Sequence, residues 1–291
     1  MPKVLIAGCG FVGLATARLF LERGWEVIGF THSEESVAKL AREAFPAFAC
    51  DIAERTAVQA QAHLGPFDAL VHCASSGRGG AEQYRRVYLE GAQNLAAAFA
   101  PASLLFTSST SVYAQTDGAW VTEESPAQPD RETGRLLRET EDFVVSQNGI
   151  IARLAGIYGP GRSVLLRKFF DNTALIEGDG TRWINQAHRD DIASALVHLV
   201  HHRVHGVHNV SDDHPLTQCE LYTWLARRFQ QALPPSGPID PHRKRGWTSK
   251  RVSNAKLRAL GWAPRFPSFY AAIERDPELI SRAGESGDAP P

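Results

Sequence analysis

Short apolar runs alternate with longer amphipathic stretches through the first half of the chain. A short apolar run between turn residues is typical of a strand buried on both faces, and the amphipathic stretches have the spacing of helices. The predicted strands are Lys3–Ala7, Trp25–Phe30, Ala47–Cys50, Asp68–Ala74, Ser103–Thr107 and Gly149–Leu154. The predicted helices between them are Leu14–Arg23, Glu34–Glu43, Glu54–His63, Glu82–Phe99 and Glu132–Gln147. This alternation predicts an α/β fold, a doubly wound parallel sheet with helices on both faces.

The pattern changes where glycine and proline punctuate the Tyr158–Gly161 segment. The elements predicted beyond it are a helix over Asp191–His201, a strand over Gly206–Val210 and a helix over Thr217–Gln231. We expect Asp190 or a neighbour to cap the first of these helices, and Thr217 with Glu220 to form a capping box on the second. The second half therefore predicts a smaller C-terminal lobe that packs against the sheet.

These patterns also predict the domain boundaries. Residues 1–158 are expected to form the sheet domain, and residues 186–212 to return to it. Residues 159–185 and 213–281 are expected to form the lobe. The end of the chain, 282–291, is rich in glycine, proline and small polar residues, so we expect it to be disordered.

The first predicted strand runs directly into a glycine motif. Gly8, Gly10 and Gly13 form a G-x-G-x-x-G between that strand and the first predicted helix. The first glycine allows a tight turn, the second lets a pyrophosphate approach the backbone, and the third lets helix and strand pack closely. The free N–H groups of the helix then face the phosphates. In this strand–turn–helix context the motif predicts a dinucleotide site.

The residue that ends the second strand predicts which dinucleotide binds. An acid there would accept a hydrogen bond from the 2′-hydroxyl of NAD, but this sequence has Thr31, His32 and Ser33. Hydroxyl groups and an imidazole suit a 2′-phosphate better, so we expect NADP to be preferred over NAD. An ordinary polar turn is the alternative interpretation of these three residues.

Composition and charge exclude several classes of protein. The chain has 291 residues, 43% of them hydrophobic, and a net charge of -1, which does not favour a nucleic-acid partner. No apolar run approaches the roughly 20 residues that span a bilayer, and no signal peptide precedes the first strand. Four widely spaced cysteines predict buried thiols in a reducing compartment, hence a cytoplasmic location.

Further motifs resemble the extended branch of the short-chain dehydrogenase/reductase superfamily, the NAD-dependent epimerase/dehydratase family. Besides the glycines, they are Cys50-Asp51-Ile52, Val71-His72-Cys73-Ala74, Phe106–Tyr113, the Arg153–Gly161 run with Tyr-Gly-Pro-Gly, Glu177–Gly180 and His188–Ala193. The resemblance covers nearly the whole chain. It implies a Rossmann fold with a C-terminal substrate lobe, a sugar-nucleotide or other small carbonyl or hydroxyl substrate, and a homodimer.

The resemblance also implies roles for residues at matching positions. The implied cofactor-binding residues are Gly8, Gly10, Phe11, Val12, Gly13, Thr31, His32, Ser33, Asp51, Ile52, Cys73, Ala74, Ser75, Ser108, Leu154 and Gly156. The implied substrate residues are Tyr158, Arg162, Arg182, Trp183 and Gln186. For Tyr158, a packing role is favoured over substrate binding.

One departure from the family concerns catalysis. Family enzymes have Tyr-x-x-x-Lys on the helix after the serine-rich strand, where the lysine lowers the pKa of the phenol. Matching Glu141 to the family's glutamate places the tyrosine position at Thr133 and the lysine position at Leu137. Arg138 lies one residue further, about 100° around the helix. Neither the proton donor nor the cation is therefore present at its usual place.

Other residues could act instead. Ser109 matches the serine that binds the substrate carbonyl, although it could simply satisfy backbone groups at a strand end. Tyr113 could be a relocated acid, but a structural role is favoured. His198 and His202 share a helix face without a companion ligand, so no metal is expected. The basic cluster of His242, Arg243, Lys244, Arg245, Lys250 and Arg251 is either a solvated surface or an anion site of the lobe.

Two functions remain open on the sequence. The first is an atypical NAD(P)-dependent oxidoreductase or epimerase, with Ser109 polarising a substrate oxygen. The second is a catalytically silent NADP-binding protein that senses redox state or regulates a partner. The absent tyrosine and lysine favour the second, and the segments that resemble the family's cleft favour the first.

Overall fold

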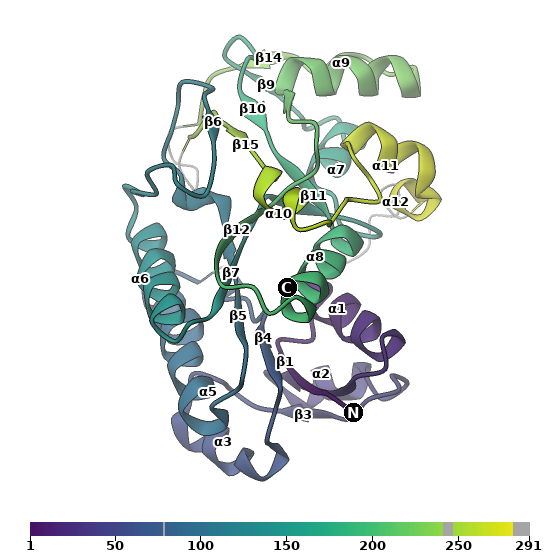
Figure 1. Ribbon diagram of the computed structural model, residues 1–291. Helices are drawn as coiled ribbons and strands as arrows, with labels where there is room; N and C mark the ends of the chain where they lie inside the picture. Colours follow the sequence, from purple (N-terminus) through teal and green to yellow (C-terminus); the bar gives the residue numbers. More distant parts are fainter. Residues whose placement is uncertain (78, 241–246, 282–291) are drawn as a thin grey trace.

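The computed structural model describes residues 1–77, 79–240 and 247–281, and its centre is one parallel sheet. Seven strands follow the order β12-β7-β5-β4-β1-β2-β3 (Figure 1). They are β1 (Lys3–Ala7), β2 (Glu26–Thr31), β3 (Ala47–Ala49), β4 (Ala69–His72), β5 (Leu104–Ser109), β7 (Ile150–Leu154) and β12 (Gly206–Val210). Strand order reverses between β1 and β4, and ligands of open α/β sheets bind at the carboxyl ends beside such a point. The predicted doubly wound parallel sheet is confirmed.

Helices cover both faces of this sheet (Figure 1). One face packs against α1 (Phe11–Glu22) and α8 (Arg189–His201), and the other against α3 (Arg55–Ala60), α5 (Gly91–Phe99) and α6 (Glu132–Ser146). Side chains alternate between the two cores: Val4 and Ile6 of β1 enter the first, and Leu5 and Ala7 the second. The continuous apolar runs of the sequence therefore reflect strands buried on both sides.

The long helix predicted over Glu82–Phe99 is interrupted by a π-helical segment. It consists of α4 (Ala81–Tyr84), the π-helical η2 (Arg85–Glu90) and α5. Burial lowers the pKa of His72 to about 4, so its ring is neutral, and Nε2 donates to the carbonyl of Val87 at 3.1 Å. The wider π turn thus presents a carbonyl to a buried imidazole at the end of β4.

The remaining chain forms a lobe with its own core (Figure 1). Its helices are α7 (Val164–Phe170), α9 (Gln218–Phe229), α11 (Phe269–Arg275) and α12 (Pro277–Ser281). Its paired short strands are β8 (Gly156–Tyr158) with β11 (Gln186–His188), β9 (Ile176–Glu177) with β14 (Ser236–Gly237), and β10 (Trp183–Ile184) with β13 (Leu216–Thr217). The short elements α2 (Glu34–Lys39), η1 (Ala62–Leu64), η3 (Thr110–Val112), β6 (Trp120–Val121), β15 (Arg251–Val252) and α10 (Ala255–Ala259) complete the fold.

The chain returns from the lobe to the sheet, since β11 leads into α8 and then into β12, which pairs with β7. The division of the chain into a sheet domain and a separate lobe stays a prediction. The tail 282–291, for which disorder was predicted, lies outside the described residues.

Helix starts agree only in part with the sequence. The capping box is confirmed, because Thr217 and Glu220 each accept the other's backbone N–H at the start of α9. At α8 the cap is His188, whose Nδ1 accepts from Asp190 N at 3.2 Å, and not Asp190 itself. Asp191, inside the first turn, accepts instead from the backbone N–H groups of Arg265 and Phe266, which ties the helix to the lobe.

Candidate functional site

The glycine motif forms a turn that is closed on two sides and open on the third. Gly8 has a φ of +102°, and a Cβ there would lie 2.4 Å from the backbone nitrogen of Ala74. A Cβ on Gly13 would lie 2.1 Å from the carbonyl oxygen of Gly8, while a Cβ on Gly10 would meet nothing within 4 Å. The turn thus packs tightly on itself and on the end of β4 but leaves free space at Gly10.

This free space adjoins the start of α1. Gly10 is the N-cap residue, and no side chain caps the helix. The backbone N–H groups of Phe11, Val12 and Gly13 therefore belong to a first turn that needs an external acceptor. A pyrophosphate fits that requirement, because the helix dipole favours an anion at this end.

Two arginines from the distant second half of the chain lie at this turn. The guanidinium carbons of Arg162 and Arg189 are 5.2 and 5.3 Å from the centre of the Phe11 ring. Arg189 also donates from Nε to Asp190 at 2.8 Å. Arg162 was predicted as a substrate residue, but its contact with Phe11 places it beside the dinucleotide turn.

Polar and charged side chains gather where the adenosine end of a dinucleotide would lie. Thr31 is buried and donates to the carbonyl of Ser33, and Ser33 caps α2. His32 is exposed, with Nδ1 3.9 Å from Asp51. Arg86 of η2 approaches the same carboxylate at 3.7 Å. Both basic groups thus lie beside the Asp51 carboxylate, and Arg86 also pairs with Glu54 at 2.7 Å.

The segment after β4 closes the other side of the turn. The backbone N–H of Cys73 donates to the carbonyl of Ala7 at 2.8 Å, which aligns Cys73 and Ala74 with the glycines. Burial raises the pKa of the Cys73 thiol, and it raises that of Cys9 to about 12. Both thiols are therefore neutral and serve packing. Ser75 accepts from the backbone N–H of Gly77, and the Ile52 carbonyl accepts from Asn94.

A buried ionic network lies behind the serine-rich end of β5. Glu141 has no exposed surface and accepts from Ser108 Oγ at 2.5 Å and from Arg153 Nη2 at 2.6 Å. Arg153 Nη1 donates to the Tyr113 hydroxyl at 2.8 Å, and that hydroxyl donates to Asn209 Oδ1 at 2.9 Å. Ser108 and Tyr113 thus already use their protons within the protein.

This network bears on two predicted roles. Tyr113 is fully buried, and burial raises the pKa of its phenol, which favours a structural tyrosine over a relocated acid. The Ser108 hydroxyl points to Glu141, so a cofactor could use only its backbone. Ser109 differs from both: its Oγ accepts from Ser111 N at 3.2 Å, and no acceptor for its own proton lies among the described residues.

The positions of the family's tyrosine and lysine lie on α6. Thr133 is half-buried in the first turn, and Leu137 is buried in the same core as Val112 and Leu136. Arg138 pairs with Glu141 and, at 2.8 Å, with Asp142. Its guanidinium therefore does not stand in for the missing lysine.

The lobe contributes the opposite wall. Gly156, beyond β7, donates its N–H to the carbonyl of Asn185, and a Cβ on Gly156 would lie 3.0 Å from Gln186 Nε2. The Gln186 amide thus lies directly against a predicted cofactor residue. Trp183 stacks on the guanidinium of Arg251, whose carbon is 5.0 Å from the ring centre. Leu154 is buried at the end of β7.

Two further residues predicted in the cleft have protein contacts of their own. Arg182 Nε lies 3.6 Å from Glu177. Tyr158 is 1% exposed and packs edge-on against His188 and Phe269, which favours packing over substrate binding.

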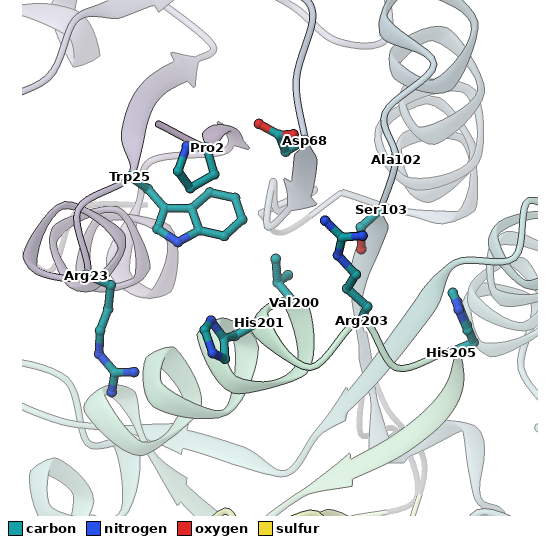
Figure 2. A pocket seen from close by; sticks show the side chains of 10 residues that line it. All are labelled: Pro2, Arg23, Trp25, Asp68, Ala102, Ser103, Val200, His201, Arg203 and His205. Carbon is teal, nitrogen blue, oxygen red and sulfur yellow. The ribbon is translucent and has the colours of Figure 1, made fainter.

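A separate cavity of about 640 Å³ lies at the other edge of the sheet (Figure 2). Its lining includes Pro2, Asp68 and Ser103, which directly precede β1, β4 and β5. All strands of the sheet are parallel, so this amino-terminal edge is opposite the glycine turn. Trp25 and Arg203 point toward this cavity in Figure 2, and it is distinct from the candidate dinucleotide site.

The described residues contain neither a metal-binding group of side chains nor a membrane-spanning helix. No group of three or more histidine, cysteine or acidic side chains could hold a metal ion there. His198 instead hydrogen-bonds the Leu260 carbonyl and packs against the tilted ring of His202 at 4.2 Å between ring centres. No helix in the described ranges is both long and apolar enough to cross a bilayer. Most of the predicted basic cluster, 242–245, lies outside these ranges.

Sequence reasoning missed the place of two charged residues near the site. Arg86 reaches the adenosine end from η2, and Arg189 reaches the glycine turn from α8. No motif marks Arg86, and the motif that contains Arg189 does not show its contact with Phe11. Only the folded contacts bring these two side chains to the site.

Comparison with known proteins places this geometry in a family. Residues 4–211 match the model of the NAD-dependent epimerase/dehydratase family. The Escherichia coli K12 protein YeeZ is 33% identical over 214 residues, which cover 69% of this chain and 73% of YeeZ.

Solved structures show the same fold. A Methylobacillus flagellatus protein, described as a candidate NAD-dependent epimerase/dehydratase, is 29% identical, with a TM-score of 0.79 over 96% of this chain and 98% of its own. The Thermus thermophilus UDP-glucose 4-epimerase, solved with NAD, has a TM-score of 0.81 at 19% identity and covers 98% of this chain and 100% of its own. The resemblance stated from the motifs is confirmed, and the chain belongs to the NAD-dependent epimerase/dehydratase family.

Proposed function

We propose that this protein is an atypical oxidoreductase or epimerase that binds NADP(H) in preference to NAD(H) and acts on a small carbonyl or hydroxyl substrate. The observation that carries the proposal is the open face at Gly10, beside a turn in which backbone atoms crowd Gly8 and Gly13. When bound, the cofactor supplies or accepts a hydride. The Thermus thermophilus neighbour was solved with NAD, which supports dinucleotide binding.

The chain's own residues then bind and orient the reactants. The backbone N–H groups at the start of α1 hold the pyrophosphate, with Arg162 and Arg189 nearby. Ser109 donates a hydrogen bond to the substrate oxygen and polarises it, while its Oγ is held in place by Ser111 N. Gln186 lies against Gly156 and orients the reacting end of the cofactor or the substrate.

The substrate class and the cellular setting are part of the same proposal. Arg182 and Arg251 favour a substrate with an anionic group, such as a sugar nucleotide. The neighbour's activity on UDP-glucose supports that class. We further propose a homodimer formed through α5 and α6 and a cytoplasmic location, where free thiols such as those of this chain persist.

A substrate panel tests the proposed activity and the role of Ser109. The panel combines NADPH with small aldehydes, ketones and an aromatic diketone, and NADP⁺ with UDP-glucose. We expect Ser109→Ala to lower kcat by about 10²–10³-fold, as loss of an oxyanion donor does. Thr133→Ala, the matched control, should change kcat little. Loss of activity in Thr133→Ala with retention in Ser109→Ala would show that the roles are assigned wrongly.

The cofactor preference rests on Thr31. We expect tighter binding of NADPH than of NADH, and we expect Thr31→Asp to move the preference toward NADH. A carboxylate there repels the 2′-phosphate and accepts from the 2′-hydroxyl of NADH. Calorimetry with both cofactors measures the change. Equal or tighter binding of NADH by the unaltered protein refutes the preference.

A catalytically silent NADP-binding protein is the second candidate, and Leu137 favours it. An apolar side chain in a packed core cannot replace a cation. In that case the protein binds NADPH tightly yet oxidises it with no member of the panel.

A further inference from the structure

Lys250 is a buried amine that has no carboxylate partner among the residues the structure describes. Its side chain is 4% exposed, and its Nζ donates to Thr248 Oγ1 at 2.9 Å. Within the described residues this hydroxyl is its sole hydrogen-bond partner. Burying an ammonium beside one neutral acceptor is costly, so such a lysine readily gives up its proton.

The backbone around Lys250 is fixed between the two walls of the candidate site. On one side, Ser249 N donates to the carbonyl of Gln115, in the segment that follows β5 and η3. On the other, Asn185 Nδ2 donates to the carbonyl of Lys250 at 2.8 Å, and Val252 N donates to Asn185 Oδ1 at 2.7 Å. Gln115 follows β5 at the carboxyl-terminal edge of the sheet, and Asn185 pairs with Gly156, which follows β7 at the same edge.

Asn185 links Lys250 to the predicted cofactor position. The carbonyl of Asn185 accepts from Gly156 N at 3.0 Å, while its side chain holds the backbone of Lys250. A single residue therefore separates Lys250 from the segment where the reacting end of the cofactor is expected. The next residue along, Gln186, lies against Gly156.

The strand that follows Lys250 joins the lobe to the core behind α6. β15 begins one residue after Lys250, and its two side chains, Arg251 and Val252, take opposite faces. Arg251 lies over the rings of Trp120 and Trp183, at 5.1 and 5.0 Å. Val252 is buried in the core that also contains Leu137, the position where the family's cation is missing. Lys250 therefore directly precedes the strand that enters this core.

Burial and a neighbouring positive charge both lower the pKa of the Lys250 ammonium. Burial lowers the pKa of its ammonium to about 8, and the nearby Arg182 guanidinium lowers it further. Arg182 also lies 3.6 Å from Glu177, and the guanidinium of Arg251 lies over the Trp120 ring. An amine that titrates slightly above neutral pH holds a proton and releases it readily, as a general acid requires.

We propose that Lys250 is the general acid of the reaction and replaces the tyrosine absent from α6. The inference rests on the proposed oxidoreductase function. In the reducing direction, a hydride from NADPH adds to the carbonyl carbon, and the carbonyl oxygen takes the proton from Lys250 Nζ. The products are an alcohol, NADP⁺ and a neutral amine, which regains a proton from water. Oxidation runs through the same steps in reverse.

The first arm of the test needs no substrate. Lysines of the folded protein are labelled with acetic anhydride from about pH 6 to about pH 11, a range that brackets ordinary lysine titration. Mass spectrometry then follows each site, with the exposed Lys168 of α7 as the internal reference. We expect labelling of Lys250 to be half-maximal near pH 8. A Lys250 that labels in step with Lys168, or at no pH, overturns the inference.

The second arm compares Lys250→Arg and Lys250→Met on the panel carbonyl that the unaltered protein reduces fastest. Arginine keeps the charge but holds its proton, and methionine keeps the length without charge. We expect both variants to lose about 10²–10⁴-fold in kcat, while NADPH affinity and melting temperature remain. The unaltered protein should lose activity as pH rises through 8.

The outcomes separate the two proposals. Activity retained by Lys250→Arg shows that charge alone matters and overturns the general acid, as does a flat pH profile. Protein that binds NADPH but reduces no panel member overturns the proposed function instead.

Discussion

Glu141→Gln is expected to lower the free energy of unfolding by about 3–5 kcal/mol, the usual effect of removing one partner from a buried ion pair. The Glu141 carboxylate is fully buried and accepts from Ser108, Arg138 and Arg153. When Glu141 loses its negative charge, the Arg153 guanidinium, which is 2% exposed, stays buried with no carboxylate beside it. Urea unfolding at neutral pH measures the loss.

The same helix offers a matched control. Glu139 of α6 pairs with Arg85 at 3.2 Å, but both side chains are about half exposed. Surface pairs contribute roughly 0–1 kcal/mol, so Glu139→Gln should change stability little. Equal losses in the two variants would contradict the view that the Glu141 network stabilises the end of β5.

Gly10→Val is expected to weaken NADPH binding at least about tenfold, roughly 1.4 kcal/mol. A Cβ at Gly10 meets nothing within 4 Å, so the valine should leave the fold intact and fill the space of the pyrophosphate. Calorimetry gives the affinity, and an unchanged melting temperature shows that the variant is folded. Gly10→Ala should have a smaller effect. Unchanged affinity in folded Gly10→Val would show that phosphate binds elsewhere.

Local patterns in the sequence were sufficient to predict the strands of the sheet. Apolar runs between turn residues specify strands such as β1 and β7, because these strands are buried on both faces. The G-x-G-x-x-G spacing likewise locates the turn, since its geometry depends on the glycines themselves. The capping box at Thr217 is local in the same sense, since its partner Glu220 is three residues away.

Features that depend on distant contacts could not be predicted. The π segment in the helix over 81–99 places Val87 beside His72, and no propensity in that helix encodes it. Likewise, Asp191 at the start of α8 accepts from the backbone N–H groups of Arg265 and Phe266, more than 70 residues further along the chain.

Even less of the candidate site than of the fold could be predicted from the sequence. Motifs located the glycines and the empty positions at Thr133 and Leu137. The sequence could not show that Arg162 and Arg189 meet at Phe11. Those contacts join segments about 150 residues or more apart in the chain, so only the fold reveals them.

A crystal soaked with NADPH tests the central claim most directly, because it shows where the dinucleotide lies. The account predicts pyrophosphate oxygens on the backbone N–H groups of Phe11 and Val12, over Gly10, with the 2′-phosphate beside Thr31 and His32. Density for the dinucleotide in the cavity at the amino-terminal edge, or none at all at saturating NADPH, would contradict it.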